Sequence, residues 1–71
     1  MSSASIAKLI AIARAAHRRR YTVTELCAVV GVSRATAYRL IGKLQSQFGM
    51  VILTDEGVEI VDYGLINRDR L

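Results

Sequence analysis

The fold is decided by residues 22–44, TVTELCAVVGVSRATAYRLIGKL, in which two stretches of helical apolar periodicity flank a glycine. The first stretch opens with a capping box, in which the Thr22 hydroxyl accepts from the Glu25 amide and the Glu25 carboxylate accepts from the Thr22 amide. Gly31 closes that stretch, because glycine adopts the left-handed conformation of a helix end without strain from a Cβ atom. The pattern predicts a helix over about residues 23–30 and a tight turn after it.

A second helix is predicted directly after this turn, over about residues 34–48. Ser33 is its N-cap and Gly49 its stop. One face of this helix is apolar and consists of Ala37, Leu40, Ile41, Leu44 and Phe48. Two helices joined by a short turn that contains glycine cross steeply, and in a helix-turn-helix protein the second one enters the DNA major groove.

Another helix is predicted before the capping box, over about residues 3–19. Apolar side chains recur there at helical spacing, at Ile6, Leu9, Ile10 and Ala13, and alanine fills much of the rest. This spacing predicts the helix.

Beyond Gly49 the apolar period changes to that of strands. Two β-branched runs flank Asp55-Glu56-Gly57 and predict a β-hairpin over about residues 50–63. Residues 64–71 fit a short helix, a third strand or a partly disordered end. The predicted fold class is thus mainly α, with three helices and a small β-hairpin.

Length and composition exclude several classes of protein. The 71 residues suit a single small domain over residues 1–71, and the lone Cys27 can form neither an internal disulfide nor a cysteine-based zinc cluster. Such cysteine usage suits a reducing, cytoplasmic compartment. One histidine and scattered acids offer no triad, metal-ligand spacing or phosphate loop, so we expect no catalytic residue, metal or cofactor. The apolar stretches fall far short of the roughly 20 residues that span a bilayer, so no membrane partner is expected.

Charge divides the chain into two regions. Residues 1–49 hold eight basic side chains and one acid, for a net charge of +7, whereas residues 50–71 hold two basic and five acidic side chains, for −3. A basic region joined to an acidic end favours a polyanionic partner for the first region alone.

Residues 24–44, and above all GVSRATAYRL at 31–40, resemble the winged helix-turn-helix domains of bacterial regulators. The similarity is greatest to the N-terminal DNA-binding domains of IclR-type and DeoR-type repressors, and it covers roughly residues 3–63. It implies that helix 34–48 is the recognition helix and that the hairpin is the wing of a double-stranded DNA-binding transcriptional regulator, with repression the expected effect. Those repressors usually carry a large effector domain, and we expect none in a chain of 71 residues, which looks more like the small regulators of phages and other mobile elements.

The outward face of helix 34–48 supplies the predicted base contacts. Arg34 and Arg39 are the leading candidates, because a guanidinium group can bond O6 and N7 of guanine together. Ala35 can touch a thymine methyl group, and Tyr38 can reach a base or a phosphate. A solvated basic face and packing of Tyr38 are the simpler alternatives.

Hydroxyls and cations around the turn are the predicted phosphate contacts. These residues are Ser33, Thr36, Lys43, Thr22, Thr24, Arg19 and Arg20. Thr22 and Ser33 act first as helix caps, and the arginines before Tyr21 also complement the dipole of the helix that they end.

The wing departs from the family pattern because its tip is acidic. Asp55 and Glu56 would face phosphates, so we predict that the wing does not enter DNA deeply but holds the core, pairs with a second subunit or binds a basic protein partner. The apolar side chains of the hairpin exceed what a three-helix core needs, which favours a homodimer or higher oligomer on DNA. An excisionase-like architectural factor and a protein-interaction module remain alternative functions.

Overall fold

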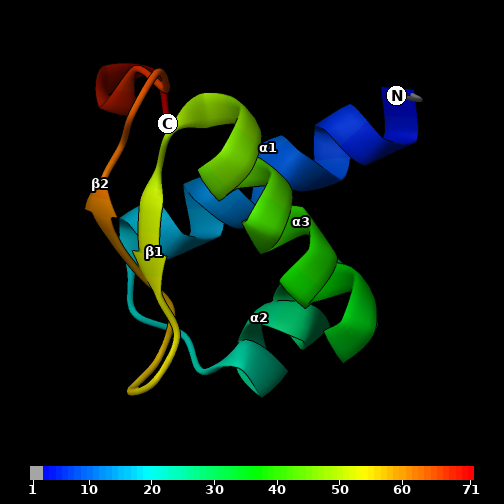
Figure 1. Cartoon of the computed structure of the whole chain (residues 1–71). Coiled ribbons are helices and arrows are strands. Elements are labelled where there is room, and N and C mark those ends of the chain that lie inside the picture. Colours follow the sequence, from blue (N-terminus) through cyan, green and yellow to red (C-terminus); the bar gives the residue numbers. More distant parts are fainter. Residues whose placement is uncertain (1–2) are drawn as a thin grey trace.

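The computed structural model describes the backbone of residues 3–71 and the side chains of residues 6–71. Three helices precede a two-stranded antiparallel hairpin (Figure 1). The elements are α1 (Ser3–Arg18), α2 (Val23–Val30), α3 (Arg34–Phe48), β1 (Val51–Leu53), β2 (Glu59–Asp62) and the 3-10 helix η1 (Arg68–Arg70). The predicted fold class, mainly α with a small hairpin, is confirmed.

Local side-chain chemistry sets the ends of α2. The amide of Glu25 donates to the Thr22 hydroxyl at 3.1 Å, and the amide of Thr22 donates to the Glu25 carboxylate at 2.9 Å, which completes the capping box. Gly31 ends the helix with a φ of +79°. The bounds of α2 are therefore those that the sequence predicts.

Helix α3 also begins and ends where its caps predict. The Ser33 hydroxyl accepts from the Thr36 amide at 3.2 Å, and Gly49 takes the left-handed conformation after Phe48. Its buried face holds Ala37, Leu40, Ile41 and Leu44, while Phe48 is half-buried at the edge of the core.

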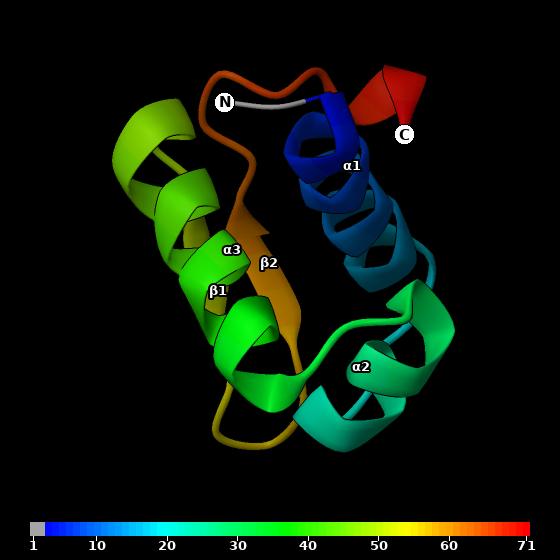
Figure 2. The same cartoon turned by 90° about the vertical axis from the view of Figure 1, so that its right-hand side faces the viewer.

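The core lies where the three helices meet the inner face of the hairpin (Figure 2). On α1 it receives Leu9, Ile12 and Ala13, whereas Ile6 and Ile10 are 47% and 44% exposed. Of the apolar positions that recur at helical spacing in α1, Leu9 and Ala13 are therefore buried, and Ile6 and Ile10 are not. Alanine surrounds these isoleucines, so several stripes of α1 are about equally apolar, and only the position of α2 and α3 selects the one that is buried.

The hairpin closes the core from one side. Ile52 of β1 pairs with Ile60 of β2, and a bulge between Val51 and Ile52 shifts the register of the strands. Ile52 and Val58 are buried, and the amide of Val58 donates to the Tyr21 carbonyl at 2.7 Å. The segment between α1 and α2 is thereby tied to the wing.

The C-terminal segment folds back over the end of α3. Gly64, with a φ of +57°, lies against the backbone of Phe48 and Gly49 so closely that no side chain would fit there. The amide of Leu65 donates to the Phe48 carbonyl at 2.7 Å, and the segment ends in η1. Of the three possibilities for residues 64–71, a short helix is the one observed.

Residues 3–71 include no helix long and apolar enough to cross a membrane.

Candidate nucleic-acid interface

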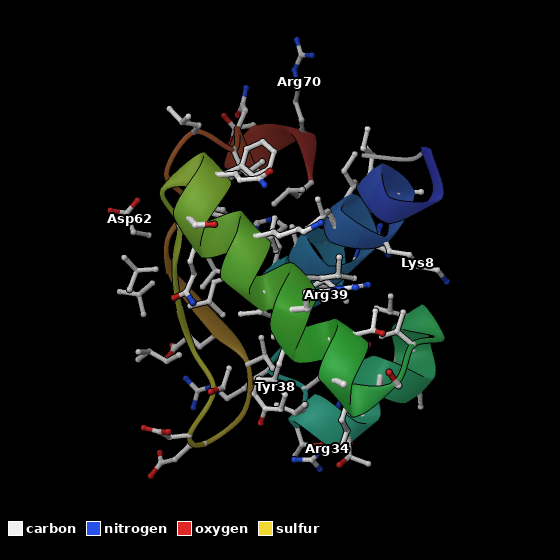
Figure 3. All side chains as sticks on the ribbon, turned by 45° about the vertical axis from the view of Figure 1, so that its right-hand side comes forward. Lys8, Arg34, Tyr38, Arg39, Asp62 and Arg70 are labelled. Atoms are coloured by element: carbon white, nitrogen blue, oxygen red, sulfur yellow. The ribbon has the colours of Figure 1, made fainter. Side chains whose placement is uncertain are left out.

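The outward face of α3 carries the four predicted base contacts. Arg34, Ala35 and Arg39 are exposed, and Tyr38 is 46% exposed. Figure 3 shows Arg34 and Tyr38 toward the end of α3 near the turn, with Arg39 farther along the same helix. Because the opposite face packs in the core, these side chains point to solvent together.

Arg34 links the starts of the two helices of the motif. Its guanidinium donates to the Thr24 hydroxyl at 3.0 Å. This bond holds the Arg34 side chain beside the N-terminus of α2, where the first amides of a helix lack intrahelical partners and favour anions. The geometry thus gathers a cation, a hydroxyl and a helix start on one surface.

A cleft of about 400 Å³ lies between this surface and the tip of the wing. Thr22, Thr24, Arg34 and Tyr38 line it from the helices, and Thr54 to Gly57 line it from the hairpin. The carboxylates of the wing tip therefore share a cleft with the predicted DNA contacts. The sequence did not reveal this approach, because the residues on its two sides lie 16 to 35 positions apart in the chain.

Two other predicted phosphate contacts, Ser33 and Thr36, form hydrogen bonds with each other. The Ser33 hydroxyl accepts from the Thr36 amide and donates to the Thr36 hydroxyl at 3.1 Å. Both side chains thus define the start of α3. Lys43 lies half-buried on α3, one turn after Arg39.

Arg19 and Arg20, just before Tyr21, make contacts of their own. The Arg20 guanidinium is 2.8 Å from the Glu59 carboxylate, in the one ion pair found within residues 3–71. Its alkyl chain lies against Gly57, and the Arg19 guanidinium stacks over the Tyr21 ring at 4.8 Å. The structure therefore brings Thr22, Thr24 and Arg34 together around one cleft, while Arg20 contacts Gly57 and Glu59 of the hairpin and Arg19 stacks on Tyr21.

Helix α2 has an ionised side chain at its start and a cation at its end. The hydrogen bond from the Thr22 backbone amide lowers the pKa of the Glu25 carboxyl, and the Thr22 hydroxyl and the charge of Arg19 act in the same direction. At the other end, the Lys8 ammonium donates to the Val30 carbonyl at 2.8 Å. Sequence reasoning missed the role of Lys8, since nothing in the local sequence indicates a bond between residues 22 positions apart.

The part of the chain that the structure describes holds no group of three His, Cys, Asp or Glu side chains arranged to bind a metal ion. Cys27 is buried and free among apolar neighbours. The side chains gathered on α2 and α3 are instead hydroxyls, guanidinium groups and a phenol, which suit hydrogen bonding to phosphates and base edges.

Comparison with known families agrees with this arrangement. The model of the family described as the IclR helix-turn-helix domain matches residues 5–47, which cover all three helices except their outermost residues. No curated relative and no solved structure shows a significant match to the chain.

Proposed function

The chain belongs to the IclR helix-turn-helix family of DNA-binding transcriptional regulators, whose domain is not an enzyme, and we propose that it reads one DNA sequence and represses transcription there. The proposal places α3 in the major groove. The observation that carries it is the exposed face of α3, which presents Arg39 and also Arg34, bonded to Thr24 near the capped start of α2.

The spacing of the two arginines suits neighbouring base pairs. Five helical residues advance by about 7.5 Å along α3, so Arg34 and Arg39 can reach different base pairs of one site. Each can bond a guanine, while Ala35 and Tyr38 between them meet a thymine methyl group and a base or phosphate.

Phosphate contacts fix the register of this reading. We assign them to the hydroxyls and amides at the starts of α2 and α3 and to the Lys43 ammonium. These residues are Thr22, Thr24, Ser33, Thr36 and Lys43. We also assign phosphate contacts to Arg19 and Arg20, whose exposed guanidinium groups would exchange their contacts with Tyr21 and Glu59 for phosphates.

The bound protein would repress transcription by blocking a promoter. It would act in the cytoplasm, on the nucleoid. One small module on one half-site binds weakly, so the proposal includes a homodimer or higher oligomer on DNA. The acidic wing is then free to meet a protein. An origin in a phage or another mobile element stays a prediction, which the genes beside the coding sequence would test.

Selection of bound duplexes from random DNA, followed by footprinting, tests the proposal. Arg34→Ala and Arg39→Ala should each weaken binding to the selected site by about 1–3 kcal/mol, or roughly 5- to 150-fold, and relax preference at one base pair. Arg18→Ala is the matched control, because it removes the same charge from the end of α1. It should cost far less affinity and leave base preference unchanged.

Two results would contradict this function. If no sequence is enriched, or if the selected site is insensitive to both α3 variants, the chain is better described as a protein-interaction module. If a site is enriched but binding bends the DNA without reducing transcription from a promoter that contains it, the chain is an excisionase-like architectural factor.

A further inference from the structure

Arg20 contacts the hairpin at two points. Its guanidinium donates to the Glu59 carboxylate at 2.8 Å. Its Cγ and Cδ atoms lie so close to Gly57 that a Cβ atom at this position would stand 2.7 and 3.0 Å from them, and the φ of +104° there also favours glycine. The Arg20 side chain thus runs along the wing and ends on β2.

This arginine lies at the end of the molecule that carries the proposed DNA contacts. It precedes Thr22, the N-cap of α2, by two residues. The wing tip, residues 55–57, lines two clefts, one of about 240 Å³ with Arg20 and Glu59 and one of about 400 Å³ with Thr22 and Arg34. Arg20 and Arg34 therefore flank the wing tip, and in Figure 1 the segment that joins α1 to α2 runs beside the hairpin toward it.

The two arginines differ in the partner that each has without DNA. The guanidinium of Arg34 donates to the uncharged hydroxyl of Thr24, so its positive charge is not cancelled. Arg20 faces a carboxylate, in the only ion pair among the side chains of residues 6–71. Of these two cations beside the wing tip, Arg20 alone is neutralised in the free chain.

The ion pair of Arg20 and Glu59 is exposed enough to exchange partners. The two side chains are 54% and 45% exposed. Exposed pairs of this kind favour the paired state by a factor of only about 1.4 to 5. A phosphate oxygen accepts the same charge-assisted hydrogen bonds from a guanidinium group as a carboxylate does. The phosphates of a bound duplex can therefore replace Glu59, but the ion pair has to break first.

We infer that the Glu59 carboxylate competes with DNA phosphates for Arg20 and so lowers the affinity of the chain for every duplex. The inference rests on the proposed function, since it needs a duplex on the surface that Thr22 and Arg34 share. Phosphates are common to all sequences, so the competition acts equally on a selected site and on unrelated DNA. Base preference is left to α3.

Binding to a duplex of unrelated sequence at about 0.15 M salt tests the competition. Glu59→Gln removes the charge that holds Arg20 and should raise the affinity about 2- to 5-fold. Arg20→Gln keeps the carbon atoms that lie on Gly57 but lacks the cation. It should lower the affinity and reduce the slope of log K against log salt concentration by about 1.

The double variant separates competition for Arg20 from a simple effect of charge. If Glu59 acts through Arg20, Glu59→Gln should add no affinity to the Arg20→Gln chain. An equal gain with and without Arg20 would show that Glu59 repels phosphates directly, and it would overturn the inference. An Arg20→Gln chain that binds as tightly as the natural chain, with the same salt dependence, would overturn it as well.

Asp62→Asn is the matched control for Glu59→Gln. Asp62 lies on the same strand, three residues or about 10 Å beyond Glu59, and asparagine retains the oxygen that accepts from the Gly64 amide at 2.8 Å. The Debye length at 0.15 M salt is about 8 Å, so a charge this far from Arg20 is largely screened and the variant should bind like the natural chain. A gain equal to that of Glu59→Gln would contradict the inference.

Two further measurements distinguish this inference from misfolding and from the proposed function. Thermal unfolding of the DNA-free variants should stay close to that of the natural chain, and Glu59→Thr, which suits a strand, repeats the test if Glu59→Gln unfolds. If selection enriches no DNA sequence while Glu59 and Arg20 remain coupled on the unrelated duplex, the proposed function fails and the inference stands. If a site is selected but the coupling is absent, the inference alone fails.

Discussion

The helical region and the hairpin share one core but present different surfaces to solvent. The three helices carry a net charge of +7 in residues 1–49, and α3 exposes arginines that pair with no carboxylate within the described chain. The hairpin and the C-terminal segment carry −3 and expose Val51, Leu53 and Val61. The helices therefore hold the side chains that suit DNA binding, and the hairpin holds those that suit contact with a protein.

The largest expected effect tests whether the hairpin is an integral part of the core. Ile52→Ala removes a side chain that is only 6% exposed and should lower the free energy of unfolding by about 2–5 kcal/mol. Leu53→Ala, one residue along the same strand but half-exposed, should cost about 0.5 kcal/mol or less. Urea denaturation compares the two variants. Equal small losses would show that the three helices are stable without the wing.

A smaller effect is expected from replacing the two acids of the wing tip by lysines. Asp55 and Glu56 line the cleft beside Arg34, so Asp55→Lys with Glu56→Lys should strengthen DNA binding. At about 0.2–1 kcal/mol for each exposed charge, the gain is roughly 2- to 30-fold and should shrink with added salt. Titration of a duplex of unrelated sequence measures it. Unchanged affinity at low salt would show that the wing tip does not approach the DNA.

The control for this double variant is Asp69→Lys, which reverses an acid in η1. It changes the net charge in the same direction but at a distance from the cleft. A comparable gain from Asp69→Lys would indicate that total charge matters, and not the position of the wing.

The sequence predicted most of the fold because its helix ends are set locally. Thr22, Glu25 and Gly31 lie within ten residues of one another, and their hydrogen bonds and conformations depend on few other contacts. The buried stripe of α1 was not predictable in the same way. There Ile12 is buried in the core and Ile10 is exposed. Because alanine makes several faces of α1 about equally apolar, the sequence does not show which face is buried, and only packing selects it.

The candidate site was predictable in part for the same reason. The outward positions of α3 follow from helical periodicity, and Arg34, Tyr38 and Arg39 are exposed as expected. Contacts between distant segments were not predictable. The pairing of Arg20 with Glu59 spans 39 residues, and nothing in the local sequence indicates it.

A loss of about 1 kcal/mol is expected from removing the cap of α2. Thr22→Ala deletes the hydroxyl that accepts from the Glu25 amide, and N-cap replacements by alanine typically cost this much stability. Thr22→Ser keeps the acceptor and should be nearly neutral. Thermal unfolding compares the two variants. If both lose the same stability, the methyl group and not the hydrogen bond is responsible, and the helix start is not set by the cap.

The smallest effect concerns the charge of Glu25, whose carboxylate is exposed to solvent. Its pKa is lowered in the folded chain, chiefly by the Thr22 backbone amide, so the folded state binds the proton less tightly than the unfolded state. The resulting stabilisation is fully present above the unfolded pKa and disappears as the pH falls through the folded pKa. Glu25→Gln retains an acceptor for the Thr22 amide without a charge. The natural chain should therefore exceed this variant in unfolding free energy at neutral pH, and the excess should vanish as the pH falls through the lowered pKa of Glu25. If the excess does not change with pH, the packing or hydrogen bonding of the Glu25 side chain, and not the charge of its carboxylate, stabilises the start of α2.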